Sequence, residues 1–316
     1  MNNSQTTNII LMIKPFKFNY NVETARDNAY QNSNIKTPSS DIAAKAKLEF
    51  ENFVKKLKKE GINVIQFNDE TNLNTPDSLF PNNWISTHGN GKICLYPMFA
   101  PNRRLERRQD ILGFLKKNFQ VNNVIDNFLK FEPLNTFLEG TGSMVLDREN
   151  KIAYACLSKR TDKSLFQDWC DVMKYKGIYF SARDEGRPVY HTNVLMSVSS
   201  EIVFICLDAI PKSEEKELLI QSFKHTNKSI LDITKDQMKN FLGNVLELKN
   251  NKEESCLVMS STAFKSLHPE QKKIISKKMK ILHSPLDTIE YFGGGSARCM
   301  IAEIFLESYK IKPQNS

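Results

Sequence analysis

Short apolar runs alternate along the chain with segments in which apolar residues recur at helical spacing. The runs predict β-strands at residues 9–13, 62–67, 92–97, 144–146, 152–157, 193–198, 202–207, 245–248 and 256–259. Helical spacing predicts helices at residues 41–60, 105–118, 163–173, 213–224 and 269–279. Polar stretches at residues 147–150 and 199–200 predict hairpin turns between adjacent strands. The order of these elements predicts an α/β protein made of repeated small units.

Three glycines at residues 293–295 precede the last apolar run of the chain. That run, residues 300–305, has helical spacing and predicts a last helix with Cys299 near its N-terminus. The free N–H groups and dipole of a helix N-terminus favour a thiolate, and Arg298 adds positive charge, so we expect a thiol more acidic than usual and a nucleophile. The glycines allow the backbone to approach a substrate closely. The alternative is a buried structural cysteine after a glycine turn.

Two further segments combine a polar residue with the start of an apolar run. His191 and Asn193 lie two residues apart, and we expect them to enter a strand with their side chains on the same face. Glu139 is followed by Gly-Thr-Gly-Ser and then by the predicted strand at 144–146. These positions suit site residues at strand ends. A hydrogen-bonded histidine at a sheet edge and a solvent-exposed turn glutamate are the alternatives.

A fourth segment, residues 77–88, packs amides, hydroxyls and aromatic rings into one predicted turn. Phe80, Asn82 and Asn83 are its candidate binding residues, because amides can both donate and accept hydrogen bonds to a polar ligand. An ordinary asparagine-rich loop is the alternative.

Length and composition indicate a soluble protein: 316 residues, 40% hydrophobic and 25% charged, can bury a sizeable core. No Pro/Gly-rich linker divides the sequence, so we expect one domain over residues 1–316. No apolar stretch approaches the roughly 20 residues of a membrane helix, so no membrane partner is expected. The apolar residues 8–13 follow no basic stretch and indicate a first buried strand instead of a signal peptide, so we expect a cytoplasmic protein.

The formal net charge of +8 raises the question of a nucleic-acid partner. The lysines are spread over the helical stretches 45–59 and 265–280 without an interleaved aromatic stripe, so we expect a solvated basic surface and no nucleic acid. The six cysteines form no CxxC pair and no metal-ligand spacing with the five histidines, which predicts neither disulfides nor a zinc site. The sequence is compatible with a homo-oligomer and does not fix the oligomeric state.

Taken together, the four segments resemble the guanidine-modifying, or pentein, superfamily, which includes arginine deiminases, dimethylarginine hydrolases and amidinotransferases. The resemblance covers nearly the whole chain, including residues 14–25. The runs Phe-Pro-Asn-Asn-Trp, Glu-Gly-Thr-Gly, Tyr-His-Thr-Asn and Gly-Gly-Gly-Ser-Ala-Arg-Cys are most similar to the citrulline hydrolase, or citrulline ureidase, branch.

The resemblance implies a five-bladed α/β propeller of pseudo-fivefold ββαβ modules around a central site. The spacing of the candidate residues agrees with this: Glu139 follows Asn83 by 56 positions, His191 follows Glu139 by 52, and Cys299 follows His191 by 108, or twice 54. Gly243-Asn244 falls near the empty midpoint. Such spacing fits one site loop per module of a repeat. These residues were chosen through the resemblance, so their spacing agrees with it without testing it independently.

The implied chemistry is hydrolysis of a ureido or guanidino carbon by a thiolate, Cys299, with no metal or organic cofactor. His191 protonates the departing amine and then deprotonates water, and Glu139 binds substrate N–H groups and orients His191. The resemblance makes Arg160 the candidate for the substrate α-carboxylate. Arg103 and Arg104 are alternatives that we expect to be surface charges at a helix start.

Substrate choice follows from a departure from the arginine deiminases, which carry aspartates at the positions of Asn83 and Asn193. Two neutral amides suit the neutral ureido group of citrulline better than a guanidinium cation, so we expect conversion of citrulline to ornithine, ammonia and carbon dioxide. Three alternatives stay open: an arginine deiminase or dihydrolase, a non-catalytic propeller that binds a partner, and a small-molecule sensor.

Overall fold

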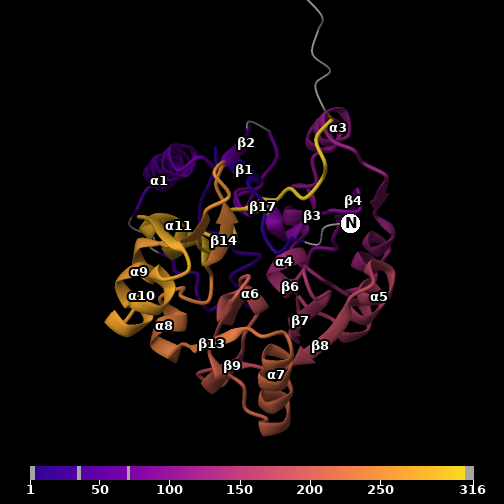
Figure 1. Ribbon diagram of the computed structural model, residues 1–316. Coiled ribbons are helices and arrows are strands. Elements are labelled where there is room, and N and C mark those ends of the chain that lie inside the picture. Colours follow the sequence, from indigo (N-terminus) through magenta and orange to yellow (C-terminus); the bar gives the residue numbers. More distant parts are fainter. Residues whose placement is uncertain (1–3, 34–36, 70–71, 310–316) are drawn as a thin grey trace, which may run out of the picture.

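The chain is known from a computed structural model that describes residues 4–33, 37–69 and 72–309. The predicted domain spans residues 1–316, so its two ends and two short internal stretches lie outside the described residues. Helices and strands alternate along the described chain, which confirms the α/β class (Figure 1).

Five three-stranded sheets and one two-stranded hairpin make up the strand structure of the described residues. In every three-stranded sheet the middle strand pairs antiparallel with one neighbour and parallel with the other. The sheets are β17 (Ala302–Glu303), β1 (Ile9–Lys14) and β2 (Asn63–Asn68); β3 (Ile85–His88), β4 (Lys92–Leu95) and β5 (Asn123–Ile125); β6 (Met144–Asp147), β7 (Ile152–Cys156) and β8 (Lys176–Phe180); β11 (Met196–Val198), β12 (Ile202–Ile205) and β13 (Ser229–Asp232); β14 (Leu246–Lys249), β15 (Ser255–Ser260) and β16 (Lys280–Ser284). The hairpin is β9 (Arg183–Asp184) with β10 (Arg187–Pro188).

Each parallel pair is joined through at least one helix, because a parallel connection must cross over the sheet. The connecting helices are α1 (Ser39–Lys59), α2 (Pro101–Arg104), α3 (Gln109–Asn118), α5 (Lys163–Met173), α7 (Ser213–His225), α9 (Ser261–Ser266) and α10 (Pro269–Ser276). Figure 1 shows α1, α3, α5, α7 and α10 at the periphery of the molecule. Four of the sheets therefore follow one ββαβ order, and in the fifth the late strand β17 supplies the antiparallel neighbour of β1.

Short elements precede or link the sheets. They are η1 (Pro81–Asn83), η2 (Asn127–Leu134), α4 (Gly140–Ser143), α6 (Thr192–Leu195), η3 (Leu207–Ala209), α8 (Lys235–Lys239) and α11 (Asp287–Gly293). Three of them, η1, α4 and α6, stand directly before the first strand of a sheet.

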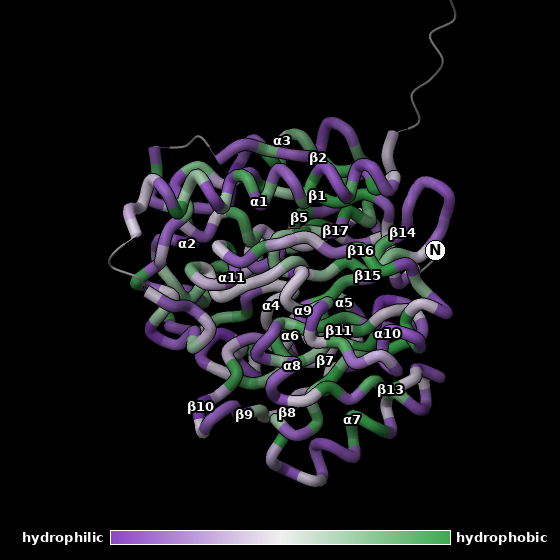
Figure 2. The backbone as a smooth tube through the Cα atoms, turned by 90° about the vertical axis from the view of Figure 1, so that its left-hand side faces the viewer, coloured by the Kyte–Doolittle hydropathy of each residue, from purple (hydrophilic) through white to green (hydrophobic). Residues whose placement is uncertain are grey.

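The hydrophobic core lies between the sheets and their covering helices. All residues of the middle strands β7 and β12 are buried, and Figure 2 shows hydrophobic colouring along interior strands and hydrophilic colouring over much of the exterior. Helix α1 buries Phe50, Phe53 and Leu57 on one face, and its chain turns at Gly61, whose φ of +87° favours glycine.

The sequence prediction missed several strands. It omitted β3 and the outer parallel strands β5, β8, β13 and β16, because these are short runs with polar residues at their ends. The predicted helix at 105–118 corresponds to α3 alone, which begins later, at Gln109, and the helices α2 and α11 were not predicted. Hairpins at 147–150 and 199–200 are confirmed by the pairing of β6 with β7 and of β11 with β12.

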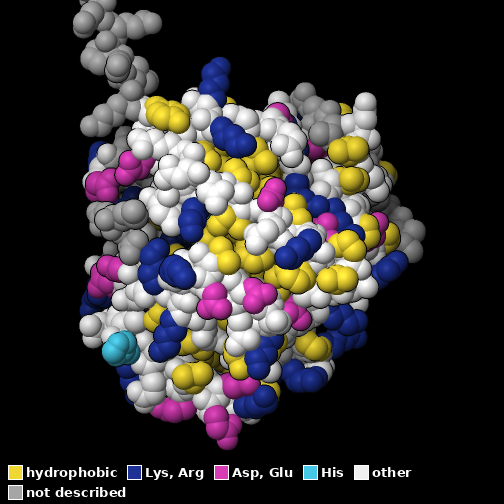
Figure 3. Space-filling model, turned by 90° about the vertical axis from the view of Figure 1, so that its right-hand side faces the viewer, with side chains coloured by type: hydrophobic (Ala, Val, Ile, Leu, Met, Phe, Trp, Pro, Cys, Tyr) yellow, Lys and Arg dark blue, Asp and Glu magenta, His cyan; other side chains and the backbone are white. Residues whose placement is uncertain are grey.

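Among the described residues no helix is long and apolar enough to cross a membrane. On the face shown in Figure 3, lysine and arginine side chains are interspersed with acidic and hydrophobic ones and do not gather into a single patch.

Candidate active site

Three predicted site residues lie on one-turn helical segments that lead into a sheet. Asn83 ends η1, Glu139 immediately precedes α4, and His191 immediately precedes α6. The expectation that His191 and Asn193 enter a strand is wrong, because Asn193 is inside α6 and strand β11 begins only at Met196. Thr192 supports the turn: its hydroxyl donates to Ser143 O and accepts from Cys156 N at 2.7 Å.

Glycines allow these segments to approach one another. Gly140 has φ of +48°, and a Cβ at this position would lie 2.4 Å from Asn82 O. A Cβ on Gly142 would lie 2.3 Å from Asn83 Nδ2 and 2.7 Å from His191 Nδ1. The run Glu-Gly-Thr-Gly is therefore required for packing Asn83 and His191 against the α4 backbone.

Glu139 and His191 form a buried pair. His191 Nε2 lies 2.8 Å from Glu139 Oε2, and Glu139 Oε1 accepts from Phe99 N at 2.8 Å. Arg160 Nη1 lies 3.5 Å from Glu139 Oε2. Both carboxylate oxygens of Glu139 are thus engaged within the protein.

The charges around this pair fix its protonation. Burial alone raises the pKa of Glu139, but Arg160 and the His191 hydrogen bond outweigh it and bring the pKa to about 2. Burial lowers the pKa of His191 below 6.5, and Glu139 opposes part of that shift. At neutral pH the carboxylate is therefore ionised and the imidazole neutral, with its proton on Nε2 facing Glu139.

Cys299 does not lie at a helix N-terminus, so this expectation is wrong. Residues 297–300 form a turn, and strand β17 follows. The apolar run after Cys299 pairs with the N-terminal strand, Ala302 with Leu11 and Glu303 with Ile10, and this long-range pairing overrides the local helical spacing. The Cys299 side chain is buried, at 4% exposure, and its Sγ accepts hydrogen bonds from Asn193 Nδ2 at 3.5 Å and Asn244 Nδ2 at 3.2 Å.

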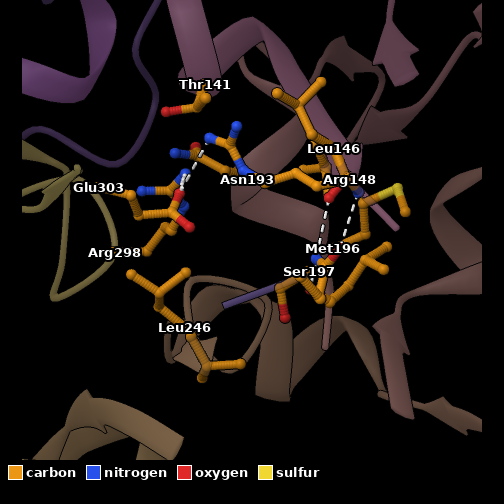
Figure 4. A pocket seen from close by; sticks show the side chains of 13 residues that line it. Thr141, Leu146, Arg148, Asn193, Met196, Ser197, Leu246, Arg298 and Glu303 are labelled. Carbon is orange, nitrogen blue, oxygen red and sulfur yellow. Dashed lines mark hydrogen bonds and ion pairs between the residues drawn. The ribbon is translucent and has the colours of Figure 1, made fainter. Parts of the chain in front are cut away.

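The Arg298 guanidinium lies close enough to Cys299 for their charges to interact, but its hydrogen bonds go to other groups. Its guanidinium donates to Glu303 Oε2 and Ile301 O, both at 2.9 Å. Figure 4 shows Arg298, Glu303 and Arg148 side by side in a cavity that Asn193 also lines. Glu303 therefore holds the guanidinium of Arg298 within this cavity.

A small cavity gathers most of the predicted site residues. Its lining includes Cys299, His191, Phe80, Asn83 and Arg160. Asn82 is buried but absent from this lining, and Asn193 reaches the site only through its bond to Cys299 Sγ. The aromatic ring of Phe80 packs on the glycine run, since a Cβ on Gly293 would lie 2.9 Å from it. Gly293 and Gly295 also line the cavity, so the glycines make room for Phe80 as well as for the cavity itself.

The arginines differ from expectation. Arg103, expected at the surface, is 2% exposed, and its Nη1 donates to Asn83 Oδ1 at 2.7 Å while it pairs with Glu106 at 2.9 Å. Arg160 is also buried and already pairs with Asp27, Nε to Oδ2 at 3.0 Å. Arg104 is only partly buried and donates to Met98 O at 3.0 Å.

Several buried polar atoms at the site have no hydrogen-bond partner among the described residues. They are Asp77 Oδ1, Asn83 Nδ2, Asn193 Oδ1 and both amide atoms of Asn82. Asp77 lines the cavity, its Oδ2 accepts from Asn21 at 2.7 Å, and burial raises its pKa against the opposing charge of Arg103. A buried acceptor or donor left without a partner is costly, and of these residues Asp77 and Asn83 line the small cavity.

Sequence reasoning gave no role to Asp77, Asn244 or Asp27. Asp77 opens the same segment as Phe80 and Asn83, and Asn244 falls at the midpoint between His191 and Cys299. The place of Asp77 in that segment and the spacing of Asn244 could have drawn attention to both residues. The sequence around Asp27 gave no sign of its bond with Arg160.

Comparisons with known proteins agree with this fold. Cyanobacterial ArgZ, an arginine dihydrolase from the ornithine-ammonia cycle, is 17% identical with a TM-score of 0.72 over 96% of this chain, which spans 41% of that one. The N-terminal domain of ArgZ bound to substrate is 16% identical with a TM-score of 0.71, covering 94% of this chain and 97% of that domain. A dimethylarginine dimethylaminohydrolase adduct is 13% identical with a TM-score of 0.63, and the match covers 94% of this chain and 99% of that one.

A search of curated proteins finds no significant match. The family model described as N,N dimethylarginine dimethylhydrolase, eukaryotic, matches residues 14–306. The chain therefore belongs to the N,N dimethylarginine dimethylhydrolase family of the pentein, or guanidino-group-modifying, superfamily.

Proposed function

We propose that this protein is a cysteine-dependent hydrolase of a small ureido amino acid, with citrulline as its preferred substrate. The observation that carries the proposal is the state of the polar groups beside Cys299. Arg103 holds Asn83 Oδ1, so the free Nδ2 of Asn83 is a neutral donor, and Glu139 has both carboxylate oxygens occupied. A neutral group with a carbonyl oxygen suits this arrangement.

The reaction begins with addition of Cys299 Sγ to the ureido carbon, which resonance protects from weaker nucleophiles. His191, neutral because burial lowers its pKa, takes the proton of the Cys299 thiol and delivers it to the departing amine. Its Nε2 is bonded to Glu139, so Nδ1 is the nitrogen that exchanges protons with the reactants. His191 then deprotonates water, which displaces the thiolate, and the resulting carbamate loses carbon dioxide to give the second amine.

The amino-acid end of the substrate matches other groups in the cavity. The free Oδ1 of Asp77 suits an α-ammonium, because a buried carboxylate with an unpaired oxygen is best compensated by a cation. Arg160 suits the α-carboxylate, and its present partner Asp27 is itself a carboxylate of the same shape. We propose that the substrate carboxylate takes the place of Asp27 on the Arg160 guanidinium.

Arginine is a second candidate substrate, as part of a dihydrolase reaction that passes through a citrulline-like intermediate. The structural neighbour ArgZ is described as an arginine dihydrolase. The observation in favour is Asp77, whose free oxygen could compensate a guanidinium instead of an ammonium. The same site then needs no second carboxylate beside Cys299.

We further infer that the five sheets close into a five-bladed propeller and that residues 1–316 act as one catalytic domain. Support comes from the repeated ββαβ order and from contacts of β6 with β11 and of β17 with β3, each between the antiparallel outer strands of different sheets. Asn83, Glu139 and His191 then each come from the entrance of a different module. A non-catalytic binding protein or sensor of the same fold would not need Cys299, His191 and Glu139 together.

The test compares kcat/KM of the purified protein for citrulline, arginine and dimethylarginine, with ammonia and ornithine as products. We expect citrulline to exceed arginine by about 10²-fold or more, as a hydrogen-bond-matched site allows. Equal turnover of arginine would defeat the citrulline assignment in favour of the dihydrolase. No turnover of any of the three would favour a binding protein or sensor.

A further inference from the structure

Asn244 is a buried amide whose entire hydrogen-bonding capacity is used around Cys299. It lies two residues before β14 and is 1% exposed. Its Oδ1 accepts from Arg298 N at 3.1 Å and from Cys299 N at 3.3 Å. Its Nδ2 donates to Asn193 O at 2.9 Å and to Cys299 Sγ at 3.2 Å.

These four bonds fix the orientation of the amide. Exchanging its oxygen and nitrogen would set the NH₂ group against two backbone N–H donors and leave a carbonyl oxygen against Asn193 O. The donor must therefore face Sγ. Gly243 allows the close approach, since a Cβ there would lie 2.3 Å from Val194 O.

We propose that Asn244 is the positioning residue for the nucleophile: it holds the 297–300 turn through its oxygen and aims Cys299 Sγ, as a thiolate, through its nitrogen. A hydrogen bond from a neutral donor favours the charged form of an acceptor and restricts its rotamer. Asn193 Nδ2 donates a second, longer hydrogen bond to the same sulfur, at 3.5 Å. With no helix at Cys299, these two side-chain amides supply the N–H donors that we had expected from a helix terminus.

The charged and titratable groups around Cys299 belong to the same cavity or to the adjacent residue. They are Asp77, Arg103, Arg160, Tyr190, His191 and Arg298. Among them only Arg298 bonds to the Asn244 side chain, and it does so through its backbone N–H and not its guanidinium, so a substitution at Asn244 alters the environment of Sγ without removing any of these charged or titratable groups.

The test is Asn244→Asp, which keeps the acceptor for both backbone N–H groups and replaces the NH₂ donor that faces Sγ and Asn193 O. The readouts are kcat and KM for the best substrate, and the rate of Cys299 alkylation by iodoacetamide from pH 6 to 10, followed by mass spectrometry. We expect kcat to fall about 10- to 100-fold with little change in KM, since Asn244 does not line the cavity. The pH midpoint of alkylation should rise by about one unit or more.

Asn240→Asp is the matched control, because Asn240 is exposed, bonds to Asp236 O and adds the same charge four residues away. It should keep the wild-type kcat and alkylation profile. If Asn244→Asp also keeps both, Asn244 merely caps the turn and the inference is overturned. Should Asn244→Asp fail to fold, Asn244→Ser keeps an oxygen acceptor without the charge and decides the question by the same two readouts.

The inference rests on the proposed function, yet the two can fail separately. Absence of turnover by the wild-type protein would defeat the function, while the alkylation profile would still report on Asn244 without any substrate.

Discussion

The two cavities on either side of the Cys299 turn differ in how their charged groups are satisfied. On the Arg298 side, Glu303 pairs with Arg298 at 2.9 Å and with Arg148 at 3.7 Å (Figure 4). Arg148 also donates to Thr87 O. On the His191 side, Asp77 keeps an unpartnered carboxylate oxygen within the described structure. Each charge of the first cluster therefore has a partner, whereas the second leaves one carboxylate oxygen without a partner among the described residues.

This difference separates structure from function. A buried ion that is fully paired is at best neutral for stability, and removing its partner is costly. A buried carboxylate oxygen with no partner costs free energy, and a bound hydrogen-bond donor or cation offsets that cost. Substitutions on the His191 side should therefore reduce activity, and those on the Arg298 side should reduce stability.

The largest effect is expected from Cys299→Ser. The hydroxyl keeps the size of the side chain and can accept the bonds from Asn193 and Asn244, so the fold should survive. Serine is a far weaker nucleophile at neutral pH, so turnover should fall below detection. The measurement is ammonia release, with the thermal midpoint recorded in parallel. Substantial activity in this variant would end the covalent mechanism.

His191→Ala should lower kcat by about 10²–10⁴-fold through loss of proton transfer. Steady-state kinetics on citrulline and on arginine provide the measurement. A near-normal rate would show that another group carries the proton.

The pH dependence of the wild-type rate tests the same role of His191. Burial lowers the pKa of His191 below 6.5, so its neutral form persists above that pKa and is lost as pH falls through it. The acid limb of kcat/KM, which reports the free enzyme, should therefore lie below pH 6.5 and be absent in His191→Ala. The free energy of unfolding should also decrease as the pH falls below 6.5, because the unfolded chain binds the His191 proton at a higher pH than the folded protein does. An acid limb above pH 6.5 would contradict this assignment.

Asn83→Asp tests the origin of substrate choice. It replaces the free Nδ2 donor with a carboxylate oxygen while Arg103 keeps its acceptor. Citrulline turnover should fall about 10- to 100-fold and the relative preference for arginine should rise. Asn193 is left unchanged, because its amide donates to Cys299 Sγ and a carboxylate there would disturb the nucleophile itself. Unchanged citrulline kinetics would remove Asn83 from the explanation.

The sequence was most informative where structure is local. Helix α5 was predicted with its observed bounds, because an amphipathic pattern and the Asp162 cap specify it without help from the rest of the chain. The outer strands such as β13 and β16 were missed, since they are stabilised by parallel pairing with strands distant in sequence.

Site residues were easier to predict than their surroundings. Cys299, His191 and Glu139 were chosen from motifs, and the structure places Cys299 and His191 in one cavity lining with Glu139 bonded to His191. The helix predicted after Cys299 is instead a turn and strand β17, because its pairing partner lies at the other end of the chain. The burial of Arg103 was equally invisible, since it depends on Glu106 and Asn83 meeting in three dimensions.

The smallest effect on activity is expected from Arg148→Met, in the cavity on the Arg298 side. Methionine retains an apolar stem near the ring of Phe305, over which the guanidinium now lies at 4.0 Å, and removes one of the two cations on Glu303. Because Arg298 still pairs with Glu303, the free energy of unfolding should fall by about 2 kcal/mol. This is less than the roughly 3–5 kcal/mol expected for a carboxylate left without any partner. Denaturant unfolding measures that loss, and kcat/KM corrected for the folded fraction should be unchanged. A large loss of kcat/KM in a stably folded Arg148→Met variant would mean that the second cavity contributes to the chemistry, and the division between the two sides of the Cys299 turn would have to be abandoned.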